Sequence, residues 1–160
     1  MNGTTNQILL SPTDATSLSP RTSLPKPPKV PCGTCPYRKD VPSGVWGASE
    51  YNKLPQYDGD TGTQFVSGGI ALFMCHQNDG CLCGGWLVTH DTRHLAALRV
   101  HDVDPSAFNY HPDVECFASG AEAAAHGLAD VDAPSPQARR KINGLVKLKE
   151  GLKTCKVPKY

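Results

Sequence analysis

The stretches Pro31-Cys32-Gly33-Thr34-Cys35-Pro36 and Cys75-His76-Gln77-Asn78-Asp79-Gly80-Cys81-Leu82-Cys83 decide how this chain folds. In the first, two residues separate the cysteines, so both sulfurs can reach one metal ion from a single turn. In the second, two cysteines flank a loop rich in turn-forming residues. We call residues 32–35 the first knuckle and residues 75–83 the second knuckle. Two such segments usually build a structural zinc or iron–sulfur site. The sequence therefore predicts a metal site with the ligands Cys32, Cys35, Cys75 and Cys83.

The spacing of the cysteines does not by itself identify the metal. Zn²⁺ is the commoner structural choice and is our first expectation. A [4Fe-4S] cluster also takes four thiolates, and a proline directly after a cysteine, as at Cys35-Pro36, is typical of ferredoxin-type ligands. Gly33 lacks a Cβ where the backbone is expected to fold around the ion.

Other residues compete for the fourth ligand position or for a second role. Cys81 has acceptable spacing from Cys75, so it is an alternate to Cys83. His76 is another alternate through its imidazole, although we expect it to orient a ligand or to face solvent. A metallo-hydrolase that uses His76 and later histidines is a third hypothesis. We expect Cys116 and Cys155, which stand apart from the others, to be small buried hydrophobic residues.

The composition favours one small, loop-rich domain. The 160 residues include 15 Gly and 14 Pro, and only 39% are hydrophobic, so a metal would add stability that the core lacks. We predict an α+β fold with short strands, a C-terminal helix and a single metal-binding domain over residues 31–160. A disordered arm rich in Ser, Thr and Pro is expected over residues 1–30. The predicted elements are a strand at 69–74 and helices at 48–54, 89–101, 120–126 and 135–151.

The chain shows no pattern typical of secretion or membrane insertion. Residues 1–31 lack a charged start followed by an apolar segment, and no apolar run approaches a membrane span. We therefore expect a cytoplasmic protein with no membrane contact, in a compartment where thiols stay reduced.

Charge is unevenly distributed along the chain. Residues 102–132 include seven acidic residues and no Lys or Arg, whereas residues 137–160 include eight basic residues and one Glu. Our first interpretation is an amphipathic helix whose cations are solvated or face the acidic stretch. The alternative is weak, salt-sensitive contact with nucleic acid through phosphates. The basic residues are Arg139, Arg140, Lys141, Lys147, Lys149, Lys153, Lys156 and Lys159.

The motifs resemble those of a known but uncharacterised family. Residues 31–38 (PCGTCPYR), 43–46 (SGVW), 73–76 (FMCH) and 83–86 (CGGW) are similar to the blocks of small actinobacterial and actinophage proteins of unknown function. The resemblance continues more loosely through residues 119–127. It implies a bacterial or phage origin, a shared cysteine site and Cys83 as the fourth ligand, because Gly-Trp follows that cysteine.

A weaker similarity is to the WhiB-like iron–sulfur regulators. Cys35-Pro36 followed by Gly44-Val45-Trp46-Gly47 resembles their order of motifs, although the cysteine that they place between these elements is absent here. We therefore expect a phage or bacterial accessory or regulatory binding module with a structural four-cysteine site, and not an enzyme. The alternative is an iron–sulfur protein with a redox-sensing or enzymatic role.

Overall fold

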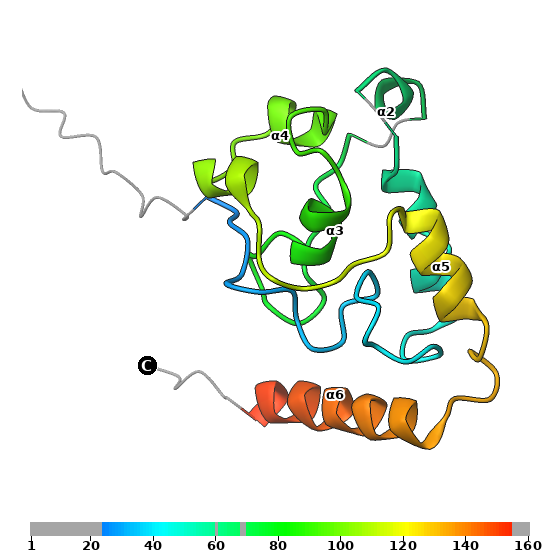
Figure 1. The fold of residues 1–160 in the computed structure, drawn as a ribbon. Coiled ribbons are helices and arrows are strands. Elements are labelled where there is room, and N and C mark those ends of the chain that lie inside the picture. The colour runs from blue at the N-terminus through cyan, green and yellow to red at the C-terminus, as the bar shows by residue number, and fades with distance from the viewer. Residues whose placement is uncertain (1–23, 60, 68–69, 155–160) are drawn as a thin grey trace, which may run out of the picture.

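Short helices joined by long turns form most of the domain (Figure 1). The computed structural model describes residues 24–59, 61–67 and 70–154. The elements in chain order are α1 (Ala48–Tyr51), the 3₁₀ helix η1 (Leu54–Tyr57), α2 (Thr61–Ser67), α3 (Gly84–Thr89), α4 (Ala96–Val100), the 3₁₀ helix η2 (Pro105–Asn109), α5 (Gly120–Leu128) and α6 (Pro136–Thr154).

The predicted α+β class with short strands is wrong. Among the described residues, strand-like pairing is limited to isolated bridges such as that between Met74 and Leu82, and no sheet forms. The apolar run expected to form a strand at 69–74 instead leads into the second knuckle. Among the described residues, the bridge of this run is with the other side of the same loop, and a single bridge does not make a stable sheet.

The single helix predicted over residues 89–101 is also wrong, because a turn divides it. α3 ends at Thr89 and α4 begins at Ala96. Between them the Asp91 side chain accepts a hydrogen bond from the Arg93 amide at 3.1 Å, and the His94 amide donates to the Asp91 carbonyl at 2.9 Å. A short acidic side chain that bonds nearby amides in this way competes with helix formation.

α5 begins at a local capping arrangement and packs closely on α1 and η1. The Ser119 hydroxyl accepts a hydrogen bond from the Glu122 amide at 3.1 Å, which satisfies one exposed donor of the first turn. A Cβ at Gly120 would lie 2.4 Å from the Leu54 carbonyl oxygen, and one at Gly127 would lie 2.0 Å from the Tyr51 ring. The two glycines therefore let α5 approach its neighbours more closely than alanine would.

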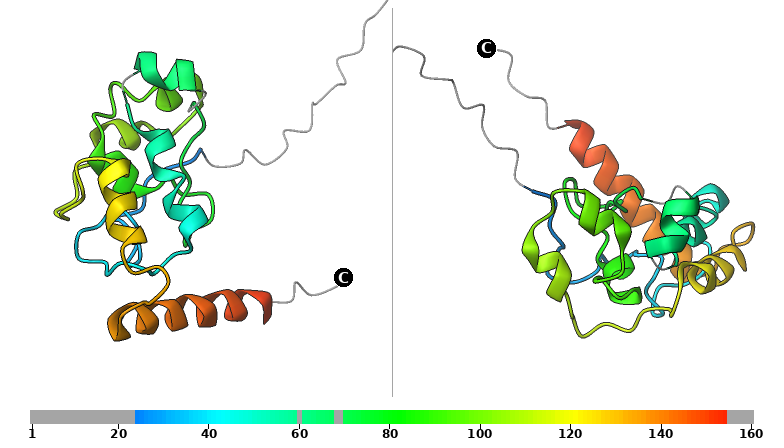
Figure 2. Two further views of the ribbon diagram at one scale, coloured as in Figure 1. Left: turned by 90° about the vertical axis from the view of Figure 1, so that its right-hand side faces the viewer. Right: turned by 90° about the horizontal axis from the view of Figure 1, so that it is seen from above.

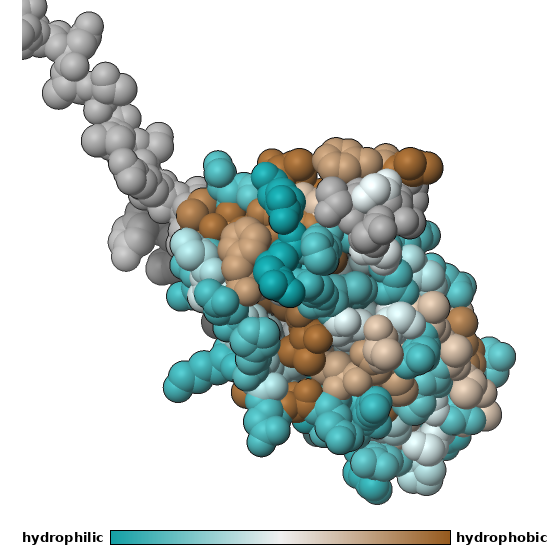
Figure 3. All heavy atoms as spheres, turned by 45° about the horizontal axis from the view of Figure 1, so that its top comes forward, coloured by the Kyte–Doolittle hydropathy of each residue, from teal (hydrophilic) through white to brown (hydrophobic). Residues whose placement is uncertain are grey.

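The main core surrounds α3. Trp86, Tyr37 and Leu82 are among its largest fully buried side chains. α2 joins it through Gln64, whose Oε1 accepts a hydrogen bond from the Ala96 amide at 2.7 Å and so caps α4. The same helix exposes apolar side chains, which contribute to the brown area at the upper edge of Figure 3.

The expected C-terminal helix is present as α6, which runs along one edge of the domain (Figures 1 and 2). Ser135 caps its N-terminus, because the Ser135 Oγ accepts a hydrogen bond from the Ala138 amide at 3.2 Å. Pro136 occupies the first turn, where its missing N–H has no cost. Ala138 and Leu145 pack with Val41 and Val45 in a second, smaller core. α6 therefore attaches to the segment that follows the first knuckle.

The end of the predicted N-terminal arm is bonded to the domain. The Leu82 amide donates to the Lys26 carbonyl at 2.9 Å, and the Asp104 amide donates to the Pro25 carbonyl at 2.9 Å. Residues 1–23 lie outside the described residues. Within the described chain, no helix combines the length and hydrophobicity that a membrane span requires.

Candidate metal centre

The first knuckle is a tight turn with amides directed at its sulfurs. The Cys35 amide donates to the Cys32 carbonyl at 3.0 Å, and the Arg38 amide donates to the Cys35 carbonyl at 3.1 Å. The amides of Thr34 and Tyr37 donate to the sulfurs of Cys32 and Cys35 respectively. Each sulfur therefore faces an N–H group two residues further along the chain, and such a bond favours the thiolate over the thiol.

The second knuckle is closed by backbone hydrogen bonds. The Cys75 amide donates to the Cys81 carbonyl at 2.8 Å, and the Cys83 amide donates to the Phe73 carbonyl at 2.8 Å. The loop reverses at Gly80, whose φ of 73° lies in the left-handed region that favours glycine. These bonds hold Cys75 and Cys83 on opposite sides of one small loop.

Donors also surround the sulfur of Cys75. The amides of Gln77 and Asn78 donate to it, and the Asn78 side-chain Nδ2 lies 3.6 Å from Sγ. The amide two residues after the cysteine is again a donor, as at both cysteines of the first knuckle. Three of the four predicted ligands thus lie in the same local arrangement.

The four predicted ligands form an unbroken row of neighbouring thiols. Cys35 Sγ lies 3.8 Å from Cys83 Sγ. The Cys32 thiol interacts with the thiols of both Cys35 and Cys75. Two thiolates that each lie about 2.3 Å from one tetrahedral zinc ion stand about 3.8 Å apart. The Cys35–Cys83 pair is therefore already spaced like two ligands of a single ion.

The row is not yet a closed ligand shell. The part of the chain that the structure describes contains no group of three or more His, Cys, Asp or Glu side chains arranged to hold a metal ion. Cys75 and Cys83 occupy the two ends of the row, and Cys83 is almost fully buried while Cys75 is half-buried. No three of the four sulfurs already share a metal position, so more than one side chain would have to turn to bring all four to one point.

Proximity and burial oppose ionisation of these thiols. The hydrogen bond with Cys35 is the largest influence on Cys32 and, with burial, raises its pKa to about 11. At Cys35, the hydrogen bond from Cys32 lowers the pKa, but the Cys83 thiol and burial outweigh it and the net shift is upward. The hydrogen bond with Cys32 and burial also raise the pKa of Cys75. A divalent cation would reverse this balance by replacing the protons.

Two side chains fix the outer side of the first knuckle. Trp46 Nε1 donates to the Thr34 carbonyl at 2.6 Å, and Lys141 Nζ of α6 donates to the Gly33 carbonyl at 2.8 Å. The carbonyls between the two cysteines therefore point away from the sulfurs. α6 and the segment around Trp46 both depend on the shape of this turn.

The sequence suggested that the site requires a glycine at position 33, but the structure requires one at position 85. A Cβ at Gly33 would meet nothing within 4 Å, so the first knuckle has room for a side chain there. At Gly85, by contrast, a Cβ would lie 2.4 Å from Cys35 Sγ and 2.7 Å from Tyr37 Cβ. Sequence analysis missed Gly85 because its neighbour in space is 50 positions away along the chain.

Three buried hydroxyls near the sulfurs have no hydrogen-bond partner within the described residues. They belong to Thr34, Tyr37 and Tyr110. Burial, together with the nearby Cys35 and Cys83, raises the pKa of both tyrosines, which therefore stay protonated. Buried donors without partners are unusual. In this structure none of them bonds a cysteine sulfur, so a bond to a metal-bound thiolate would require the sulfur to move toward the hydroxyl.

The two alternate ligands lie at the margin of the site. The Cys81 backbone is part of the second knuckle, but no thiol hydrogen bond links its side chain to the row among the described residues. His76 Nε2 lies 2.9 Å from Glu50 Oε2, and its ring lies against that of Trp46 with 5.0 Å between centroids. Cys83, and not Cys81, is therefore the cysteine that the fold places beside Cys35.

The remaining cysteines stand apart. Cys116 forms a bridge with Arg38 on the opposite side of the first knuckle, and burial raises the pKa of its thiol to about 11. Cys155 lies outside the described residues. Cys116 packs against the main core, but no thiol hydrogen bond links it to the row among the described residues.

Both ring nitrogens of His90 are bonded, one of them to the carboxylate of Asp58. His90 Nδ1 lies 2.7 Å from the Trp86 carbonyl oxygen and its Nε2 lies 2.7 Å from Asp58 Oδ1. Asp58 also accepts from the amides of Gly120 and Ala121 at 2.6 and 2.8 Å. Both ring nitrogens are occupied, so neither is available as a base or metal ligand. The group links η1, α3 and α5.

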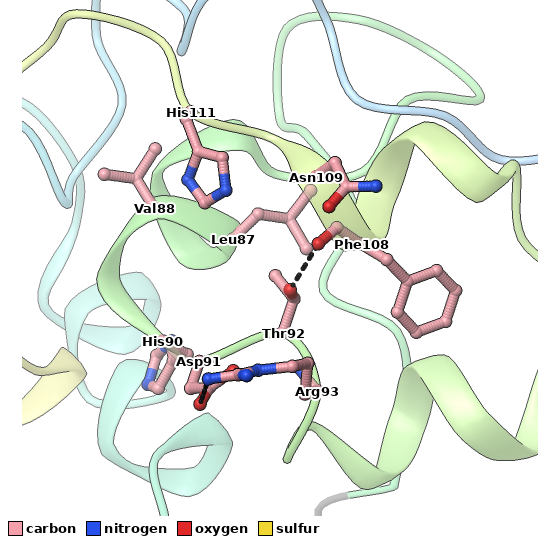
Figure 4. A pocket seen from close by; sticks show the side chains of 9 residues that line it. All are labelled: Leu87, Val88, His90, Asp91, Thr92, Arg93, Phe108, Asn109 and His111. Carbon is pink, nitrogen blue, oxygen red and sulfur yellow. Dashed lines mark hydrogen bonds and ion pairs between the residues drawn. The ribbon is translucent and has the colours of Figure 1, made fainter.

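A cavity of about 400 Å³ lies beside His90 (Figure 4). Arg93 and Asp91 form a two-bond ion pair at its edge, with distances of 3.0 and 2.9 Å. The Thr92 hydroxyl donates to the Phe108 carbonyl at 3.0 Å. These polar groups bond to one another and do not converge on a common point. The lining of the cavity therefore indicates a binding site less clearly than the row of thiols does.

The fold and the two knuckles define a small helical domain organised around clustered cysteines. The chain belongs to a family of unknown function, DUF6283, whose model matches residues 27–144. That segment contains all four predicted ligands and ends within α6. The expected membership in a family of unknown function is thus confirmed. No curated protein and no solved structure matches the chain.

Proposed function

We propose that Cys32, Cys35, Cys75 and Cys83 bind one structural Zn²⁺ ion that stabilises a binding or regulatory module. The observation that carries this proposal is the 3.8 Å separation of Cys35 Sγ and Cys83 Sγ within a continuous row of four thiols. The amides directed at three of the sulfurs support it. Such bonds favour thiolates, which are the form that binds a metal.

The size of the site favours a single ion over a [4Fe-4S] cluster. In such a cluster each thiolate binds a different iron, so the cysteine sulfurs stand further apart than two ligands of one ion. Cys35 and Cys83 would have to separate to admit it. Both are almost fully buried, and Gly85 packs so closely on Cys35 Sγ that an added Cβ would lie 2.4 Å from it. The cluster remains the alternative that metal analysis excludes or establishes.

A four-thiolate zinc site is closed, which favours binding over catalysis. Structural zinc uses all four positions for protein ligands, whereas catalytic zinc keeps one open. Binding of such an ion also supplies folding free energy, because the ligands are not assembled in the unfolded chain. A domain with 39% hydrophobic residues and no sheet in its described part benefits from that contribution.

The setting and partner of the module are also proposals. The family resemblance supports an accessory protein of bacterial or phage origin in a reducing cytoplasm. If a phage encodes the protein, this cytoplasm is that of the host cell. Its partner is proposed to be nucleic acid, contacted weakly through phosphates by the basic C-terminal segment. The support is charge: α6 has five Lys or Arg residues and no acidic residue from Pro136 to Lys149.

Replacement of single cysteines by serine tests the metal site. The variants Cys32→Ser, Cys35→Ser, Cys75→Ser and Cys83→Ser should each lose zinc and unfold at lower temperature, measured by elemental analysis and thermal denaturation. Cys116→Ser is the matched control, because its thiol is half-buried but outside the row. Full zinc content in Cys83→Ser with loss in Cys81→Ser would transfer the fourth position to Cys81. Zinc content unchanged in all four variants would refute the site.

A further inference from the structure

The cations of α6 are not neutralised by the acidic stretch of the chain. Within the described residues, none of the five basic residues from Pro136 to Lys149 forms an ion pair. Lys141 is bonded to a backbone carbonyl of the first knuckle, and Arg139 Nε donates to the Pro134 carbonyl. The first interpretation from the sequence allowed these cations either to be solvated or to face residues 102–132, and pairing with that stretch is not observed among the described residues.

α6 has two distinct faces. Ala138 and Leu145 are buried against Val41 and Val45, so one face is fully used to hold the helix on the domain. The opposite face carries exposed side chains at helical spacing, and in two views no other described element covers it (Figures 1 and 2). We call this the outward face of α6. Its members are Arg140, Asn143, Gly144 and Lys147.

Gly144 in this face is unexplained by the packing of the domain itself. A Cβ at this position would meet nothing within 4 Å, and its φ is not in the left-handed region. Glycine is the poorest helix former after proline, so an interior glycine weakens α6 without a gain in packing. Glycine is the residue of choice where a backbone must approach a ligand closely. Its position between Arg140 and Lys147 places such an approach at the centre of a cationic surface.

We propose that the outward face of α6 enters the major groove of double-stranded DNA, with Arg140 and Lys147 at phosphates and Gly144 admitting close approach of the helix backbone. This inference rests on the proposed nucleic-acid contact and specifies its form. The major groove of B-DNA is about 12 Å wide and admits an α-helix of about 10–12 Å diameter. Charge complementarity supplies the attraction.

Other polyanions fit this surface less well. The major groove of double-stranded RNA is too narrow for a helix. Single strands are usually held by aromatic stacking, and no aromatic residue lies on the outward face. An amphipathic helix on a membrane inserts a continuous apolar face. On α6, Ala138 and Leu145 are buried on the domain, and the half-exposed Val146 and Leu148 lie two residues apart and so on opposite sides of the helix.

Fluorescence anisotropy with a short labelled DNA duplex at a series of salt concentrations tests the proposal on the full chain. Arg140→Ala/Lys147→Ala should weaken binding about tenfold or more and lower the slope of log affinity against log salt by about 2. The control Lys39→Ala/Lys53→Ala removes the same charge from exposed sites outside α6 and should change both quantities much less.

Gly144→Gln separates a binding role of the glycine from a structural one. Glutamine is a better helix former and has room at this position, so the variant should melt at a higher temperature than wild type. If the backbone lies in the groove, the same variant should bind DNA about tenfold more weakly. Gly144→Gln should therefore be more stable than wild type and yet bind DNA more weakly only if the outward face contacts DNA. Metal content measured on each variant shows that the knuckles are intact.

The outcomes separate this inference from the proposed function. If wild type binds no nucleic acid at low salt, both fail. If it binds duplex DNA but the control pair loses as much affinity as the α6 pair, or Gly144→Gln binds like wild type, the outward face is wrong and the nucleic-acid contact stands. Tighter binding to duplex RNA or to polyglutamate than to duplex DNA would overturn the assignment to the major groove.

Discussion

Substitution of Gly85 by alanine should weaken metal binding, because the new methyl group would occupy the place of the Cys35 sulfur. The Cβ would lie 2.4 Å from Cys35 Sγ and 2.7 Å from Tyr37 Cβ. Ordinary contacts between such atoms are about 3.5–4.0 Å, so the sulfur or the helix must move by about 1 Å. Overpacking of this kind costs about 1–3 kcal/mol in a well-packed core.

The strain should fall mainly on the metal-bound state. Without the ion the Cys35 thiol can rotate away from Gly85, whereas an ion fixes the sulfur in place. A difference of about 1–3 kcal/mol between the two states corresponds to zinc affinity that is about 5- to 150-fold weaker. The stabilisation of the fold by added zinc should shrink by the same amount.

Competition with a chromophoric chelator under reducing, oxygen-free conditions measures this affinity. Gly33→Ala is the matched control, because it lies in the first knuckle and its Cβ would meet nothing within 4 Å. That variant should bind zinc like wild type. Wild-type affinity in Gly85→Ala, or an equal loss in both variants, would show that Cys35 does not bind the ion where the structure places its sulfur.

Three further predictions concern the surroundings of the site. Tyr110→Phe removes a buried hydroxyl that has no hydrogen-bond partner. If that hydroxyl bonds a thiolate when zinc is bound, the zinc affinity of the variant should fall about 10–100-fold, while the stability of the metal-free protein is unchanged. A zinc affinity equal to that of wild type would refute the bond. Asp58→Asn should lower the free energy of unfolding at pH 7 by about 1–3 kcal/mol, measured by urea denaturation. Burial raises the pKa of Asp58, but the hydrogen bonds from His90 and from two backbone amides outweigh burial, so the net shift of this pKa is downward. The ionised Asp58 therefore stabilises the folded state at pH values above its ordinary pKa of 3.8, and this stabilisation is lost as the pH falls further. The gap between wild type and Asp58→Asn should therefore close on acidification, and a constant gap would contradict this. Deletion of residues 24–28 in addition to 1–23 should lower the melting temperature relative to deletion of 1–23 alone, because it leaves the buried Leu82 amide without its acceptor.

Local patterns in the sequence predicted the local features of the fold. Pro136 and the apolar spacing that follows predicted α6, and the alanine run after Ser119 predicted α5. Spacing alone placed the two knuckles. These features depend on residues within one or two turns of each other, which a single sequence displays directly.

The errors arose where contacts distant in sequence decide the structure. The apolar run before Cys75 has strand propensity, but within the described residues no neighbouring strand pairs with it, and it leads into the second knuckle instead. The Asp91 turn is a local exception, since bonds from the Arg93 and His94 amides to Asp91 stop a helical pattern within three residues. Gly85 and Tyr110 carry no local signal that relates them to the sulfurs, because that relation exists only after folding.

Elemental analysis of the full chain, purified without oxygen and in reducing buffer, tests the central claim most directly. Four thiolates that share one closed tetrahedral site predict about one zinc per chain and a colourless protein. Several irons per chain with inorganic sulfide and a brown colour would establish the [4Fe-4S] alternative. A folded chain that contains no metal would contradict the metal site altogether.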